Sequence, residues 1–272
     1  MNGIQVKNLV KTYTTQSTDI ILNGAKRPST TRTVLHGVSA DFPAGKLTAI
    51  LGRSGCGKST VVNMLIGAYR PKAGIVAVGG KPLESVTRES YYSHIASVSY
   101  NTYIFNDTVR ANFELAKQNV SDEEIWAALE KVNLAGFIKE NGGLDKVITE
   151  DANNVSGGQK QRLALAVNLV ADKDIYVFDE ATSNIDIESE AIIMRNIKAM
   201  SAEKSVIVIS HRLANVVPAD NIYFMEEGEV KERGSHAQLM AASGGYAKLF
   251  NAQKQLEEGY KEITGIAAEE KA

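Results

Sequence analysis

Along this chain, apolar residues gather in a few short, almost uninterrupted runs, and the segments between them are mixed or polar. Such runs occupy residues 47–51, 175–178 and 205–209. Runs of this length without polar alternation are typical of parallel strands that are covered on both faces of a sheet. The pattern therefore predicts an α/β core built around a mostly parallel sheet.

A different periodicity fills the middle of the chain, where residues from about 107 to 171 look largely helical. Ser121, followed three residues later by Glu124, has the pattern of a capping box. Apolar residues then recur at helical spacing over 125–132, and an Asn-Gly-Gly sequence interrupts the block farther on. We therefore expect a helical subdomain, at about 101–171, inserted into the core.

The amino-terminal part is expected to form an antiparallel β region, because residues 4–13 and 34–51 are strand-rich. Residues 14–32 are rich in Thr, Ser, Asn and Gly and predict a long surface loop. At the other end, the charged and alanine-rich residues 251–272 predict either a surface helix or a frayed tail. The expected division is a single domain over 1–250, with its core at about 1–100 and 172–250.

Composition narrows the class of protein. The chain has 272 residues, of which 44% are hydrophobic, enough for a substantial core. The 30 basic and 32 acidic residues give a formal net charge of −2, so nucleic acid is not an expected partner. A single cysteine, Cys56, excludes an internal disulfide. Because no apolar run reaches membrane-spanning length and the start lacks a signal-peptide pattern, the chain is expected to be soluble and cytoplasmic in character.

The candidate chemistry begins at residues 52–59, Gly-Arg-Ser-Gly-Cys-Gly-Lys-Ser, between a strand-like and a helix-like run. Glycines there allow successive backbone N–H groups to turn toward one anion, and the helix N-terminus adds the positive end of its dipole. Lys58 is expected to reach the β- and γ-phosphates of a nucleotide, and Ser59 to place its hydroxyl on Mg²⁺. The segment therefore predicts a phosphate cradle.

Two further polar positions are expected at the same sheet edge. Asp179 and Glu180 follow one apolar run, and His211 follows another; ligands of open parallel sheets bind at such strand ends. Asp179 is expected to hold Mg²⁺ and Glu180 to orient and deprotonate the attacking water. His211 is placed to contact the γ-phosphate or that water.

Residues 155–159, Val-Ser-Gly-Gly-Gln, precede a second helical run. They are compatible with an ordinary capped helix start, because Ser is a favoured N-cap. They are equally compatible with a second phosphate-binding helix N-terminus. Since the chain already has one phosphate cradle, the second interpretation requires a nucleotide held by another subunit.

Together these residues resemble the nucleotide-binding domain of ATP-binding cassette transporters over about residues 4–250. In this resemblance, residues 52–59 look like Walker A, 156–159 like the signature motif, 175–180 like Walker B with its catalytic glutamate, 183–186 like the D-loop, and His211 like the switch histidine. Tyr13 is similar in place to the aromatic residue that stacks on adenine.

The resemblance implies three sets of site residues. The implied nucleotide-binding residues are Tyr13, Gly52, Arg53, Ser54, Gly55, Cys56, Gly57, Lys58, Ser59, Thr60, Ser156, Gly157, Gly158, Gln159 and Asp186. The implied catalytic residues are Glu180, His211 and Lys58, and the implied Mg²⁺ ligands are Ser59 and Asp179. Tyr100 stands where the family carries a glutamine that helps to bind Mg²⁺ and senses the membrane domain. A phenol is a poorer ligand than a carboxamide, so slower hydrolysis or altered coupling is expected.

The finer pattern at 105–112 and 210–213 resembles exporter-type cassettes. It implies an Mg²⁺-dependent ATPase at the cytoplasmic face of a membrane, partnered by a transmembrane domain and by a second nucleotide-binding domain. The two cassettes would sandwich ATP head to tail and drive transport, in the export direction. Two alternatives stay open: a nucleotide-sensing regulatory cassette with impaired hydrolysis, and a soluble cassette ATPase that does not transport.

Overall fold

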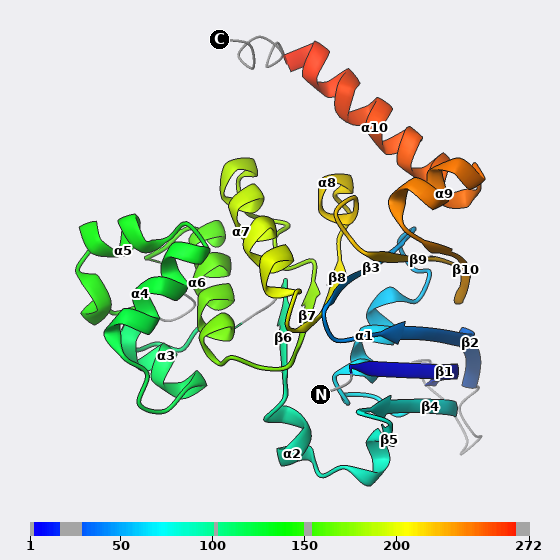
Figure 1. The fold of residues 1–272 in the computed structure, drawn as a ribbon, viewed down its shortest axis with the longest axis horizontal. Helices are drawn as coiled ribbons and strands as arrows, with labels where there is room; N and C mark the ends of the chain where they lie inside the picture. Colours follow the sequence, from blue (N-terminus) through cyan, green and yellow to red (C-terminus); the bar gives the residue numbers. More distant parts are fainter. Residues whose placement is uncertain (1–2, 17–28, 101–102, 150–153, 265–272) are drawn as a thin grey trace, which may run out of the picture.

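The computed structural model describes residues 3–16, 29–100, 103–149 and 154–264, with side chains up to residue 256. Ten strands form two sheets in this part of the chain. A four-stranded sheet has the order β2 (Ser29–Phe42), β1 (Ile4–Gln16), β4 (Ala73–Val78) and β5 (Lys81–Pro82). A six-stranded sheet has the order β10 (Glu229–Gly234), β9 (Asn221–Glu226), β3 (Lys46–Gly52), β8 (Ser205–Ile209), β7 (Ile175–Asp179) and β6 (Ile95–Ser99). Figure 1 shows the two sheets and the helical part beyond β6.

The predicted fold class is confirmed by the strand directions. The smaller sheet is antiparallel, whereas β9, β3, β8, β7 and β6 run parallel to one another and only β10 is antiparallel. The strand β7 illustrates why its apolar run has no polar alternation. Ile175 and Val177 join the core cluster that includes Val61, while Tyr176 and Phe178 join the cluster that includes Leu163. Both faces of this sheet are therefore covered.

The described ranges contain six helices in the core and four in the helical block. Those of the core are α1 (Lys58–Leu65), α2 (Arg88–Tyr92), α7 (Ile187–Met200), α8 (Leu213–Val216), α9 (His236–Ala242) and α10 (Gly245–Thr264), with a 3₁₀ turn at Leu83–Ser85. Those of the helical block are α3 (Val109–Ala116), α4 (Asp122–Lys131), α5 (Ala135–Glu140) and α6 (Gly157–Val170), with a 3₁₀ turn at Gly143–Asp145. Ser121 and Glu124 form the predicted capping box at the start of α4. Phe113, Ile125 and Leu129 are fully buried and belong to the same core cluster as Tyr176 and Phe178, so this block shares an apolar core with one face of the six-stranded sheet.

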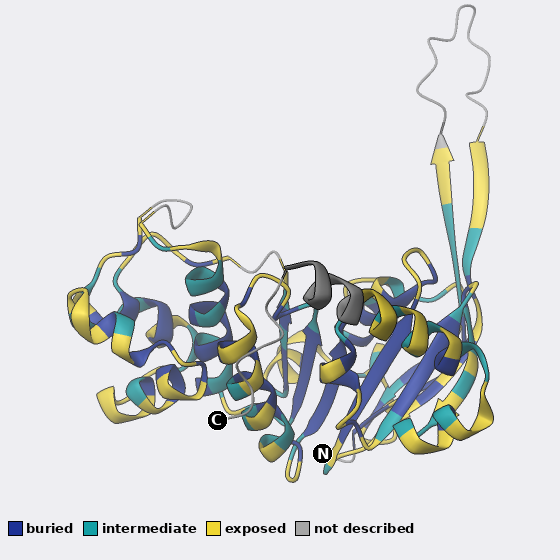
Figure 2. Ribbon diagram, turned by 90° about the horizontal axis from the view of Figure 1, so that it is seen from above, coloured by how far each residue is buried: buried dark blue, intermediate teal, exposed yellow. Residues whose placement is uncertain are grey.

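The expected surface loop over 14–32 is partly wrong. Strands β1 and β2 continue as an antiparallel ribbon, in which Thr14 pairs with Thr31 and Gln16 pairs with Ser29. Residues 17–28 lie outside the described part. Threonine is polar, so the segment looks like a loop, but its β-branched side chain favours extended backbone. Figure 2 shows the exposed ribbon projecting from the body of the domain.

The carboxyl-terminal segment is helical as far as residue 264, because α10 runs from Gly245 to Thr264. Of the two expectations for this segment, a surface helix or a frayed tail, the helix is therefore the one found up to that point. The proposed boundary at 250 therefore falls inside a helix. Gln253 on α10 donates to the carbonyl of His211 at 3.4 Å, so the start of the tail touches a candidate site residue. None of the helices in the described ranges is long and apolar enough to span a bilayer.

Candidate active site

The loop after β3 has a backbone that requires glycine at specific positions. A Cβ on Gly52 would lie 2.2 Å from the carbonyl oxygen of Met225, and one on Gly57 would lie 2.6 Å from Leu35 Cδ2. Gly57 also has φ 107° and is the left-handed N-cap of α1. Any larger residue at these two positions would push the loop away from the neighbouring strands. The close approach keeps the N-terminus of α1 open as an anion site.

Lys58 folds back over this loop. Its Nζ donates to the carbonyl of Gly52 at 2.7 Å and to that of Arg53 at 3.1 Å, and the residue is 6% exposed. A buried ammonium needs acceptors for its protons. Backbone oxygens supply them here, and phosphate oxygens in the loop would be stronger acceptors because they are charged.

Glu180 and His211 meet beside the loop. They follow β7 and β8, which are parallel neighbours, and His211 Nε2 lies 2.7 Å from Glu180 Oε1. Glu180 has φ 54°, a left-handed conformation uncommon for a residue other than glycine, and its N–H donates to the carbonyl of Ile209 at 3.0 Å. Such strained backbone gathers at functional sites. The carboxylate and the imidazole thus converge at one edge of the sheet, as expected from the sequence.

A cavity of about 210 Å³ joins these groups to the glycine loop. Its lining residues are Val34, Ser54, Gly55, Gly57, Lys58, Ser59, Thr60, Glu180 and His211. It therefore combines backbone donors, an ammonium, a hydroxyl, a carboxylate and an imidazole. This set can bind a phosphate group and place a base next to it.

A second cavity of about 230 Å³ contains the candidate metal ligands Ser59 and Asp179, together with Ser99, Tyr100 and Glu180. Burial, followed by the nearby Glu180 charge, raises the pKa of Asp179. A bound cation would offset the cost of ionising Asp179, and the oxygen donors here are of the kind that Mg²⁺ prefers. Within the described ranges no three His, Cys, Asp or Glu residues gather for a metal. Water and phosphate oxygens would have to complete the coordination.

The residues of the second glycine motif form the start of α6. Ser156 Oγ accepts from the N–H of Gln159 at 3.2 Å, and Gln159 Oε1 accepts from the N–H of Ser156 at 2.8 Å. A Cβ on Gly158 would lie 2.9 Å from the carbonyl oxygen of Asn184. Among the described residues lining the cavities at the glycine loop, none comes from 156–159. The chain thus does not bring its two glycine motifs together.

Tyr13 and Asp186 are also not among those lining residues. The Tyr13 ring packs edge-on against Tyr69, with centroids 6.1 Å apart, and Lys11 Nζ lies 5.4 Å from its centroid. Asp186 caps α7 by accepting from the N–H of Ser189 at 2.8 Å, and this amide holds the Asp186 pKa low. Their assignment to nucleotide binding stays a prediction.

The other predicted residues of the glycine loop border a third cavity, of about 360 Å³. Arg53 and Cys56 line it with Ser54 and Gly55, and Arg32 of β2 also belongs to the lining. Cys56 is 5% exposed, and Gly228 donates to its carbonyl at 3.1 Å. The thiol is therefore a packed side chain of the loop.

Sequence reasoning missed Gln161, Glu190 and Arg212. Gln161 on α6 donates to the carbonyl of Glu180 at 3.3 Å and accepts from the N–H of Asn184 at 3.2 Å. Glu190 and Arg212 form an ion pair beside His211. The signal for Arg212 was its place directly after His211, inside the exporter-type pattern at 210–213. Glu190 gave no signal, because a Glu in the first turn of a helix is ordinarily exposed to solvent and interacts favourably with the helix dipole.

The comparison with known families decides the assignment. The model of the family described as ABC transporter matches residues 35–183, which contain the glycine loop, the α6 start and β7 with Glu180. The chain belongs to the ABC transporter family. This confirms the resemblance stated from the motifs, and the family consists of ATPases coupled to transport.

Individual relatives agree with the exporter-type pattern. An uncharacterized ABC transporter ATP-binding protein of Haemophilus influenzae is 43% identical over 82% of this chain and 40% of the relative. An ATP-dependent lipid A-core flippase of Aliivibrio fischeri is 40% identical over 83% of this chain and 39% of the relative. The solved structure of a bacterial Atm1-family ABC exporter with ATP bound matches with TM-score 0.81 and 32% identity, over 93% of this chain and 42% of that one. This ABC cassette thus spans about 40% of the length of these relatives.

Proposed function

We propose that this ABC cassette binds and hydrolyses Mg²⁺-ATP and thereby drives export of a substrate across a membrane. The observation that carries the proposal is the convergence of Lys58, Glu180 and His211 on one cavity at the N-terminus of α1. Adjacent parallel strands place the carboxylate and the imidazole, and the glycine loop faces both. The solved structure named as an exporter supports the direction of transport, and a relative named as a flippase supports transport across a membrane.

The chemistry follows from these groups. The triphosphate would lie on the loop amides, and Lys58 would exchange the carbonyls of Gly52 and Arg53 for β- and γ-phosphate oxygens. Glu180 would take a proton from the attacking water, and the leaving group would be ADP. His211, held 2.7 Å from Glu180, would orient that water and the γ-phosphate. Bound Mg²⁺, on Ser59 and Asp179, would supply charge neutralisation between the phosphates.

The active site is proposed to be completed by a second cassette. Ser156 to Gln159 lie at an exposed helix start and line no cavity at this chain's own glycine loop. In a head-to-tail pair, the α6 N-terminus of one cassette would face the triphosphate held by the other. ATP would then join the two chains, and hydrolysis would release them. Either a second copy or a paralogue fits this arrangement.

A membrane-embedded partner is the second proposed association, at the cytoplasmic face of the membrane. The relatives are longer than this chain by more than half of their own length, which leaves room for transmembrane helices. An aromatic cavity of about 340 Å³, lined by Tyr69, Tyr91 and Tyr92, offers a docking surface. Tyr69 and Tyr92 are 43% and 48% exposed, and apolar surface of this kind marks interaction sites. It shares no lining residue with the cavities at the glycine loop.

The decisive experiment measures the initial rate of Mg²⁺-ATP hydrolysis against protein concentration, with Glu180→Gln as the blank. A rate that rises with the square of concentration supports sites assembled between two identical chains. A linear rate that persists at the lowest concentrations, together with a monomeric mass, would refute the head-to-tail site. A wild-type rate equal to the blank, with ATP still bound, would contradict hydrolysis by this chain alone.

One observation favours a second candidate, a nucleotide-sensing regulatory cassette with impaired hydrolysis. Tyr100 lines the cavity that contains Ser59 and Asp179 and is 54% exposed. A phenol there is a weak metal ligand and occupies space that a smaller carboxamide would leave to water. ATP binding without turnover in the wild type, restored by Tyr100→Gln, would support this candidate.

A further inference from the structure

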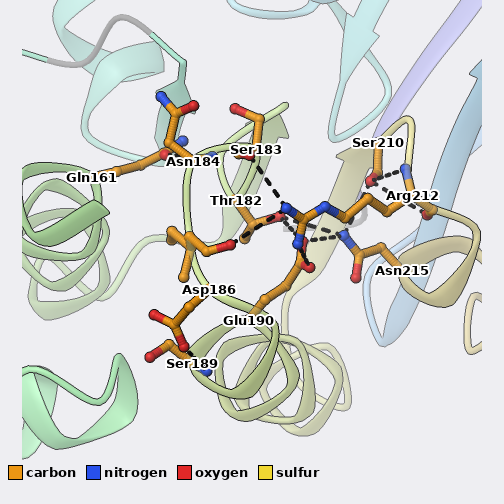
Figure 3. A network of polar contacts seen from close by, with 11 residues as sticks. Gln161, Thr182, Ser183, Asn184, Asp186, Ser189, Glu190, Ser210, Arg212 and Asn215 are labelled. Carbon is orange, nitrogen blue, oxygen red and sulfur yellow. Dashed lines mark hydrogen bonds and ion pairs between the residues drawn. The ribbon is translucent and has the colours of Figure 1, made fainter. Parts of the chain in front are cut away.

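A buried carboxylate on α7 lies at the junction of the loops that carry the proposed chemistry (Figure 3). Glu190 is 6% exposed. Its Oε1 accepts from Thr182 Oγ1 at 2.6 Å and from Asn215 Nδ2 at 2.8 Å, and its Oε2 pairs with Arg212 Nη1. The donors come from two segments: Thr182 lies in the loop after β7, whereas Arg212 and Asn215 are the N-cap and the third residue of α8, directly after His211. One carboxylate on α7 therefore holds both segments.

Arg212 extends this junction to the loop before α7. Its Nη2 lies 3.3 Å from the carbonyl oxygen of Ser183 and 3.4 Å from that of Ile185. Its own N–H donates to Ser210 Oγ at 3.0 Å. The planar guanidinium serves several acceptors at once, a geometry that lysine does not reproduce. Loop 182–186 and the His211 loop are thus joined through a single side chain.

The energetics favour one arrangement of this junction. Ionised carboxylates taken from water are costly unless their oxygens are fully hydrogen-bonded, and removal of one partner leaves the other uncompensated. Both Glu190 oxygens have donors here, so moving either loop alone would break a charged contact. We therefore expect the two loops to move together or not at all.

We propose that Glu190 is a positioning residue for ATP hydrolysis, which holds the His211 loop and loop 182–186 in one shared geometry through Arg212. The inference rests on the proposed function. Glu190 would act only through other residues, since it lines none of the cavities at the glycine loop. Because loop 182–186 also meets α6 through Asn184 and Gln161, a change at the α6 start would reach His211 along this path.

The test compares Glu190→Gln with the wild type in steady-state hydrolysis and in equilibrium ATP binding. Gln keeps an acceptor for Thr182 and Asn215 but removes the charge that holds Arg212. Arg212 is 38% exposed in its side chain, so water can solvate it and the variant should fold. We expect kcat to fall about 10- to 100-fold, as for a displaced catalytic group, while the ATP dissociation constant changes less than about twofold. Asp122→Asn, which breaks the exposed pair with Arg110, is the matched control and should keep both values.

Hydrogen exchange supplies a readout independent of turnover. In Glu190→Gln, peptides covering 182–186 and 210–215 should exchange faster together, while those covering α4 should not change. Arg212→Lys should give the same pair of accelerations because an ammonium cannot serve the same acceptors. An unchanged kcat, or acceleration of only one loop, would overturn the proposal. An inactive wild type would instead refute the proposed function, so the two failures are distinguishable.

Discussion

His211 Nε2 lies 2.7 Å from Glu180 Oε1, and the contact exists because β7 and β8 are parallel neighbours that end together. We expect His211→Ala to lower kcat by about 100-fold or more, because Glu180 would lose the partner that orients it. The ATP dissociation constant should stay within about twofold, since the loop amides and Lys58 remain. Steady-state kinetics and a nucleotide-binding titration measure the two quantities.

His94→Ala is the control for this variant. His94 precedes β6 and its Nδ1 lies 2.6 Å from Asp174 Oδ2, away from the glycine loop. The His94→Ala variant should retain the wild-type kcat. An equal loss of kcat in His211→Ala and His94→Ala would mean that the histidine substitutions act through impaired folding, and would contradict a specific role for His211.

Tyr100→Gln addresses the residue that departs from the family pattern. Tyr100 lines the cavity shared by Ser59 and Asp179. A carboxamide oxygen is a ligand of the kind that Mg²⁺ accepts, so hydrolysis should rise severalfold and its Mg²⁺ requirement should fall. Rates measured over a magnesium series test this. Tyr103→Gln, at an exposed aromatic nearby in the sequence, is the control, and a lower rate for Tyr100→Gln would contradict the prediction.

Asp179→Asn should stabilise the metal-free protein and lower its rate of ATP hydrolysis. Burial and the Glu180 charge raise the pKa of Asp179, so the folded state holds this proton more tightly than the unfolded state. Above its folded pKa the ionised group therefore destabilises the metal-free protein, and Asn removes that cost. We expect a higher melting temperature at pH 7 without Mg²⁺, and hydrolysis lower by about 100-fold or more.

The control for Asp179→Asn is the same substitution at Asp122. Its hydrogen bond from Arg110 lowers the pKa of that carboxyl, so Asp122→Asn should lower or leave unchanged the melting temperature. A melting temperature that falls equally in both variants would show that burial at Asp179 carries no penalty.

Acid stability offers a test away from the active site. The hydrogen bond from His94 lowers the pKa of Asp174, so the unfolded state binds this proton more readily. The stabilisation is therefore present above the unfolded pKa, about 3.9, and is lost as pH falls from there through the lower folded pKa. Asp174→Asn should flatten the dependence of unfolding free energy on pH in this window. The change should be at most about 1 kcal/mol, because the pair is partly exposed.

Denaturant titrations at several pH values measure this slope. His94→Ala should flatten it as Asp174→Asn does, and the double variant should add nothing further, because the two residues form one contact. Additive effects would show that Asp174 owes its low pKa to other groups.

Much of the fold was predictable because its signals are local. The run 175–178 has no polar alternation since Ile175 and Tyr176 enter opposite core clusters, and Ser121 with Glu124 marked the start of α4. The ribbon at Thr14 and Thr31 was missed because polarity and β-propensity conflict in threonine-rich segments.

The candidate site divides in the same way. Lys58, Glu180 and His211 follow apolar strands, so sheet topology alone brings them together. Glu190 could not be predicted, because its burial depends on where α7 lies against Thr182 and Arg212. Nothing within its own helix distinguishes it from a solvated first-turn carboxylate.

Cys56 gives the last prediction, since it is the only thiol in the chain. It is 5% exposed, its Sγ lies 4.0 Å from Lys58 Nζ, and it occupies the phosphate loop. Alkylation should be slow, because the loop must open to admit the reagent. Once attached, the group would fill space next to Lys58 and should abolish ATP binding.

Mass spectrometry of the labelled fraction, followed by ATP titration, measures both effects. Prior saturation with ATP should slow labelling, because ligand binding disfavours loop opening. Cys56→Ala should bind ATP with or without the reagent, which separates the modification from general damage. Full labelling with unchanged ATP affinity would place the nucleotide away from this loop and would contradict the proposed site.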